Sequence, residues 1–136
     1  MIQVIHGKKG SGKTKKLLDK ANETIKVAKG DIVFIDDDNR YMFDLGHEIR
    51  FINASEYSIV GPDAFYGYIC GILAQNFDIH YIFVDAFMKL VAVEAEQTRD
   101  FFEKLAAIAE KRNITFVMSV NVDDAIAPDF MKQYFI

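Results

Sequence analysis

Apolar and polar positions follow two different rhythms along this chain, and the rhythm predicts which segments are strands and which are helices. Short apolar runs rich in β-branched and aromatic residues are typical of buried strands. They occupy residues 2–6, 31–36, 49–52, 81–84 and 114–120. Between them, apolar residues recur every three or four positions, as on the inner face of a helix. These helical segments cover about residues 12–28, 62–77 and 92–112.

The order of these segments predicts the fold class. Strands that alternate with helices form right-handed crossovers, which place helices on both faces of a parallel sheet. We therefore expect an α/β protein with three layers and a mainly parallel five-stranded sheet. The length of 136 residues suits a single domain, residues 1–136. The tail from Asp123, which contains Pro128, is predicted to form a short helix.

Composition and charge restrict the class of partner. The net charge of −4 does not support a broad nucleic-acid surface, because such a surface needs Lys and Arg to replace counterions. The N-terminus lacks the basic and apolar regions of a signal peptide, and no apolar run is as long as a membrane span. The single cysteine, Cys70, cannot form an internal disulfide. We expect a cytoplasmic protein with no membrane span.

The turn after the first strand carries the strongest chemical signal. Residues 7–14 match the pattern G-x-x-x-x-G-K-[ST] in full. Glycines there let backbone N–H groups surround phosphate oxygens, and the following helix adds its positive N-terminus. Lys13 is expected to reach the β- and γ-phosphates, and the Thr14 hydroxyl to ligate Mg2+. The predicted nucleotide-binding residues are Gly7, Lys8, Lys9, Gly10, Ser11, Gly12, Lys13 and Thr14.

A carboxylate follows the fourth predicted strand. Asp85 comes directly after Tyr81–Val84, and ligands of an open parallel sheet bind at the carboxyl ends of its strands. Asp85 should therefore lie at the same edge as the glycine-rich turn. We predict that it holds Mg2+ together with Thr14. The alternative is an aspartate that only caps the next turn.

Residues 7–14 and 81–85 together resemble the P-loop NTPase superfamily. The resemblance implies a three-layer P-loop NTPase fold with a RecA-like (ASCE) ATPase core, and it covers about residues 1–122. In such cores the strand after the phosphate-loop helix ends in an acidic residue that orients the attacking water. Asp36, Asp37 and Asp38 stand there in this sequence. Ser119 and Asn121, at the end of the fifth strand, stand where such cores carry a polar residue that senses the γ-phosphate.

The chain is also similar to small bacterial proteins labelled twitching-motility-type ATPases. It is much shorter than true secretion motors and shows no histidine-rich box, so we do not carry over a motor function from this resemblance.

The catalytic residues are less well defined than the phosphate site. The resemblance implies a water-orienting glutamate, but this sequence has only aspartates after the second strand. Glu56, after the third strand, is a second candidate base. We predict Lys13, Asp37, Asp38 and Glu56 as the catalytic set, with a solvated turn or surface role as the alternative for the three acidic residues. Arg40 and Arg112 are candidates to stabilise phosphate charge.

The predicted function is Mg2+-dependent ATP binding with weak ATP hydrolysis, and the predicted cofactors are ATP and Mg2+. Slow turnover is expected unless a partner completes the site, and a homo-oligomer or another protein is the candidate for that partner. One alternative is a small nucleoside or nucleotide kinase, although the four arginines are widely spaced and no lid segment is evident. A second alternative is a non-catalytic module whose ATP occupancy switches a protein interface.

Overall fold

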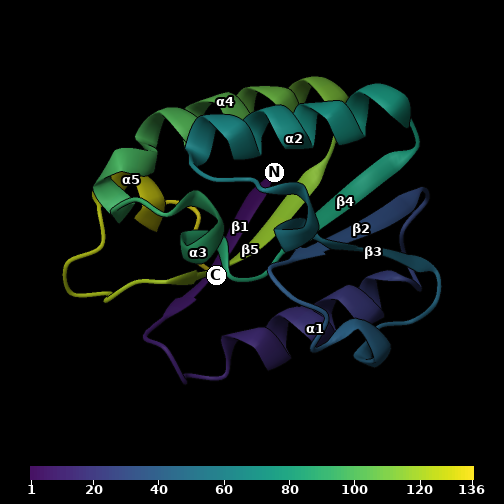
Figure 1. Ribbon diagram of the computed structural model, residues 1–136, viewed down its shortest axis with the longest axis horizontal. Helices are drawn as coiled ribbons and strands as arrows, with labels where there is room; N and C mark the ends of the chain where they lie inside the picture. The colour runs from purple at the N-terminus through teal and green to yellow at the C-terminus, as the bar shows by residue number, and fades with distance from the viewer.

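A single five-stranded sheet forms the centre of the molecule. The computed structural model describes residues 1–136 (Figure 1). Every pair of neighbouring strands is parallel, and their order is β1-β5-β4-β2-β3. The strands are β1 (Ile2–Gly7), β2 (Asp31–Asp36), β3 (Ile49–Asn53), β4 (Ile79–Val84) and β5 (Thr115–Asn121). This confirms the predicted α/β class and strand number, and the sheet is entirely parallel.

Helices cover both faces of the sheet, which gives the three expected layers. One face is covered by α1 (Lys13–Thr24), as Figure 1 shows. The other face carries α2 (Pro62–Gln75), α3 (Phe87–Val91), α4 (Arg99–Arg112) and α5 (Asp129–Lys132). Three short 3-10 turns connect these elements: η1 (Met42–Asp44), η2 (Ala54–Tyr57) and η3 (Ala95–Thr98). None of the helices combines the length and the apolar character needed to span a bilayer.

The core is divided by the sheet into two parts because successive strand residues point to opposite faces. On β2 and β4, Phe34 and Phe83 pack toward α1, with ring centroids 6.2 Å apart. Their neighbours Ile35 and Ile82 are buried on the opposite face, among the side chains of α2, α3 and α4. Because both faces are covered, the strands are apolar runs rather than alternating ones.

The helices differ from the sequence prediction more than the strands do. The helix predicted over 92–112 begins only at Arg99, because Ala92 takes a left-handed conformation (φ 54°) and residues 95–98 form η3. Helix α3 was not predicted, since five residues are too few to show a helical period. Helix α1 ends at Thr24 because the hydrogen bonds of the next residues shift to the i→i−3 pattern, with Val27 N donating to Thr24 O.

The C-terminal tail extends the sheet beyond β1. The predicted short helix is present as α5, and the chain then runs alongside β1. Val4 N donates to Tyr134 O at 2.8 Å, and Ile136 N donates to Val4 O at 3.0 Å. The ring of Phe135 stacks on His6, with centroids 3.8 Å apart. The tail thus covers part of the β1 edge, and β3 forms the opposite edge of the sheet.

A pair of glycine variants tests the close packing before β2. A Cβ atom added at Gly30 would lie 2.0 Å from the backbone oxygen of Asp78, whereas one at Gly71 in α2 would meet open space. We expect Gly30→Ala to lower the free energy of unfolding by about 1–3 kcal/mol through overpacking. Gly71→Ala should raise it by about 0.5–1 kcal/mol, because alanine favours the helix. Urea denaturation measures both, and equal effects would contradict the described packing.

Candidate functional site

The glycine-rich turn connects the end of β1 to the start of α1 at the carboxyl edge of the sheet. Gly12 takes a left-handed conformation (φ 85°) immediately before the first residue of α1, which lets the chain enter the helix directly. Gly7 also has a positive φ of 142°, and a Cβ atom there would lie 2.7 Å from Ser11 Oγ. The turn therefore needs glycine at both positions. The first turn of α1 contains no acidic residue, so its N-terminus keeps its partial positive charge.

The side chain of Lys13 folds back over this turn. Its Nζ donates to Lys8 O at 2.8 Å and to Ser11 Oγ at 3.3 Å, and the residue is only 7% exposed. Burial lowers the pKa of the Lys13 ammonium, and the negative charge of Asp85 opposes that shift. The turn thus holds a partly desolvated ammonium group beside its backbone.

Three hydroxyl and carboxylate groups meet at the ends of α1, β4 and β5. Thr14 Oγ1 donates to the Asp85 carboxylate at 3.1 and 3.3 Å. Ser119 Oγ also donates to Asp85 Oδ1 and accepts from Ala86 N at 3.2 Å. Asp85 is buried, and its carboxylate is held by two hydroxyl groups from neighbouring elements. Adjacent hydroxyl and carboxylate oxygens are the hard ligands that suit Mg2+, so Thr14 and Asp85 fit the predicted metal role.

The acidic end of β2 faces this group. Asp36 is 2% exposed, its Oδ1 accepts from Asp37 N at 2.7 Å, and its Oδ2 has no hydrogen-bond partner. Burial, the neighbouring Asp37 side chain and the charge of Asp85 raise the pKa of Asp36 to about 8. Asp37 lies 3.6 Å from Lys89 Nζ, and Asp38 lies 3.8 Å from Arg40. The two outer aspartates therefore have basic neighbours, whereas Asp36 has none.

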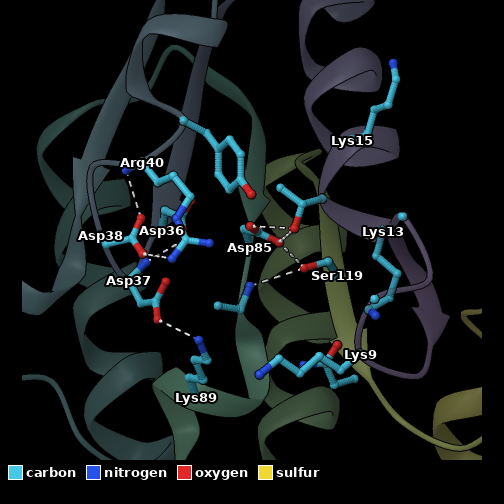
Figure 2. A pocket seen from close by; sticks show the side chains of 16 residues that line it. Lys9, Lys13, Lys15, Asp36, Asp37, Asp38, Arg40, Asp85, Lys89 and Ser119 are labelled. Carbon is cyan, nitrogen blue, oxygen red and sulfur yellow. Dashed lines mark hydrogen bonds and ion pairs between the residues drawn. The ribbon is translucent and has the colours of Figure 1, made fainter.

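Most of these groups line one cavity of about 500 Å³, shown in Figure 2. The structure brings together residues from the glycine-rich turn, the acidic end of β2 and the polar ends of β4 and β5. Those named as candidates from the sequence are Lys9, Gly10, Gly12, Lys13, Thr14, Asp36, Asp37, Asp38, Arg40, Asp85, Ser119 and Asn121. Gly7, Lys8 and Ser11 belong to the same turn but do not line the cavity.

Two predicted residues lie elsewhere. Glu56 is exposed on η2 and does not line the cavity, because β3 is the strand farthest from β1 in the sheet. Arg112 donates to Leu73 O at 3.3 Å and stacks on Phe77, 4.9 Å from the ring centre. Conversely, the cavity includes Lys89, which no sequence signal indicated because it lies on the short helix α3.

Comparisons with known proteins give a likeness in structure but none in sequence. No family model and no curated protein matches the sequence. Among solved structures, a KaiC-like protein of the hyperthermophilic archaeon Pyrococcus horikoshii OT3 matches with a TM-score of 0.66. The two are 15% identical, and the match covers 98% of this chain and 68% of that chain.

A likeness at this identity shows the fold alone. Together with the parallel sheet, it confirms the predicted three-layer α/β fold, which this chain shares with the KaiC-like protein. No match in sequence links the chain to proteins labelled twitching-motility-type ATPases.

The buried carboxyl of Asp36 predicts an unusual pH dependence of stability. With a pKa of about 8 in the folded protein, the Asp36 carboxyl keeps its proton at pH values where the unfolded chain has lost it. The free energy of unfolding is therefore highest below about pH 4 and falls as the pH rises toward 8. Asp36→Asn should remove this fall in stability. In chelator-containing buffer, we expect the variant to gain on the order of a few kcal/mol over the wild type between about pH 5 and pH 8. Urea denaturation at several pH values measures this, and a difference that does not change with pH would contradict it.

Proposed function

We propose that this protein binds ATP with Mg2+ in the 500 Å³ cavity and hydrolyses it slowly. One observation carries the proposal: a glycine-rich turn at the N-terminus of α1, the Lys13 ammonium and the Thr14–Asp85 pair all line the same cavity. Backbone N–H groups, a helix N-terminus and a lysine are a combination that suits polyphosphate.

Phosphate binding would use groups that are already close to their working positions. Lys13 would exchange its bonds to Lys8 O and Ser11 Oγ for bonds to phosphate oxygens. The exchange replaces two neutral acceptors with anionic ones, so the hydrogen bonds of the ammonium would also become ion pairs. Lys9 and Lys15 also line the cavity and would offset the remaining phosphate charge.

Thr14 and Asp85 would hold Mg2+, which when bound neutralises charge on the phosphate oxygens. The two side chains come from different elements and already lie within 3.3 Å of each other. Ser119 fixes the Asp85 carboxylate by donating to Oδ1. This contact would keep Asp85 oriented toward Thr14 when the cavity fills.

Slow hydrolysis follows from the acidic groups that line the cavity. They are four aspartates and no glutamate. Asp37 and Asp38 have basic neighbours, and Asp36 is mostly protonated near neutral pH, since its pKa is raised to about 8. A protonated carboxyl cannot accept a proton from water. Asp37 and Asp38 are therefore the proposed water-orienting groups, and their shorter side chains and ion pairs limit turnover.

Lysine variants test the phosphate site directly. Lys13 lines the cavity, whereas Lys16, on the same helix, is exposed and does not. We expect Lys13→Ala to weaken Mg-ATP binding at least about tenfold, because it removes a charge-assisted hydrogen bond worth about 1.5–3 kcal/mol. Lys16→Ala should leave the affinity nearly unchanged. Calorimetric titration measures both, and unchanged binding by the Lys13 variant would refute the role given to this residue.

A second cavity favours phosphoryl transfer as the alternative function. It has a volume of about 330 Å³ and is lined in part by Leu18, Asp19 and Asn22 of α1. It shares Thr14, Lys15 and Tyr41 with the first cavity, so an acceptor hydroxyl could approach the phosphate end. Incubation with ATP and a panel of nucleosides separates the two functions. A phosphorylated nucleoside would replace the hydrolase proposal, and release of inorganic phosphate alone would support it.

The absence of a glutamate from the cavity lining also fits a module that binds ATP without cleaving it. Intact ATP binding with no phosphate release at any protein concentration would favour such a module. Light scattering with and without ATP would then show whether nucleotide drives self-association.

A further inference from the structure

The acidic end of β2 gathers three carboxylates without an equal number of close cations. Asp36 is the last residue of β2, and Asp37 and Asp38 follow it. One carboxylate oxygen from each of the three lies within 4.8 Å of the others. Figure 2 shows these side chains on the side of the cavity opposite Lys13. Like charges at this spacing repel, so the cluster needs either protons or a cation.

We propose that Asp36, Asp37 and Asp38 form a binding site for a hard divalent cation, separate from the Thr14–Asp85 pair and filled without nucleotide. The chemistry of the ligands sets the class of ion, because carboxylate oxygens suit Ca2+, Mn2+ and Mg2+ and not the softer metals. The inference is independent of nucleotide binding.

The unpartnered oxygen of Asp36 is the observation that points to a ligand. The residue is 2% exposed and lines the cavity. Its Oδ1 is satisfied by Asp37 N, while Oδ2 has neither a hydrogen bond nor an ion pair. Buried polar atoms are costly when they lack a partner. A cation beside Oδ2 would supply that partner and compensate the repulsion from Asp37 and Asp38.

The basic side chains nearby do not take this role. Lys89 contacts Asp37 Oδ2 at 3.6 Å and Arg40 contacts Asp38 Oδ2 at 3.8 Å. Both bases are largely exposed, and such long surface pairs contribute only about 0–1 kcal/mol. Each ion pair uses only one carboxylate oxygen, and the other oxygen of Asp38 accepts a neutral hydrogen bond from Arg40 N at 2.8 Å. The outer aspartates therefore remain able to bind a cation together with Asp36.

The spacing of the oxygens is compatible with one shared ion. Metal–oxygen distances of about 2.0–2.1 Å for Mg2+ and about 2.3–2.6 Å for Ca2+ place two oxygens on opposite sides of one ion about 4.0–5.2 Å apart, and adjacent ligands lie closer. The three carboxylate oxygens lie within 4.8 Å of one another, so one ion could contact all of them. The site is therefore open to Ca2+, Mn2+ and Mg2+ alike.

The carboxylate of the Thr14–Asp85 pair, unlike Asp36 Oδ2, already has hydrogen-bond partners. Both oxygens of Asp85 accept hydrogen bonds from Thr14, and Oδ1 also accepts from Ser119. A cation at the end of β2 therefore does not need Asp85 as a ligand. The different partners of Asp36 and Asp85 allow substitutions to tell the two sites apart.

Binding of Mn2+ to the nucleotide-free protein, measured by electron paramagnetic resonance at about pH 8, tests the proposal. We expect the wild type to bind about one Mn2+ per chain. Asp36→Asn should weaken this binding at least about tenfold, since it removes one charged ligand. The exposed control Asp129→Asn should bind Mn2+ as the wild type does, and Asp85→Asn should weaken the binding less than Asp36→Asn does, through the loss of a nearby negative charge. If Asp36→Asn does not fold by circular dichroism, Asp38→Asn takes its place with the same expected loss.

No Mn2+ binding by the wild type would overturn the proposal and would mean that a proton on Asp36 compensates the cluster. Equal loss in Asp36→Asn and Asp85→Asn would also overturn it, because a single shared ion would then explain the data. Lys13→Ala separates this result from the nucleotide proposal. It should lose ATP affinity and keep Mn2+ binding in the absence of nucleotide.

Discussion

The parallel direction of the five strands is the constraint on which the site depends. Because every strand runs the same way, the polar residues that end β1, β2, β4 and β5 all arrive at one edge of the sheet. Strand β5 separates β1 from β4, so the glycine-rich turn and Asp85 lie one strand apart. Thr14 at the start of α1 spans that distance and contacts Asp85. The cavity follows from this arrangement.

Buried charged groups at this edge of the sheet lower the folding stability of the ligand-free protein. The cavity places four aspartates beside several lysines, and burial shifts the pKa of Lys13 downward and that of Asp36 upward. Both shifts disfavour the charged form of the residue, so the folded protein is less stable at any pH at which that residue is charged. Bound phosphate would compensate Lys13, and a bound cation would compensate the aspartates. The groups that lower the stability of the free protein are therefore the ones expected to contact a ligand.

Much of the fold could be predicted from the sequence because both faces of the sheet are covered. Strand β2 has its predicted bounds, and β4 starts two residues early only because His80 interrupts the apolar run. Helix α3 could not be predicted, since five residues contain too few positions to show a period. The helix before β5 starts later than predicted because Ala92 takes a left-handed conformation, which residue type alone does not reveal.

The candidate site was predicted where one continuous segment carries the chemistry, as in residues 7–14, and where a strand ends in a charge, as at Asp85. Residues whose place in the site depends on the order of the strands in the sheet could not be predicted. Glu56 follows β3, which lies at the far edge of the sheet, so it does not line the cavity. Lys89 and the unpartnered oxygen of Asp36 depend on contacts between separate elements. Sequence spacing does not encode such contacts.

The proposed function rests on backbone amides of the glycine-rich turn that bind the phosphates of a nucleotide. Nuclear magnetic resonance of the labelled protein, titrated with Mg2+ and a non-hydrolysable ATP analogue, tests this binding at each amide. We expect the amide signals of Gly10, Gly12 and Lys13 to change most. Unchanged signals at these three residues, with the largest changes elsewhere on the molecule, would contradict it.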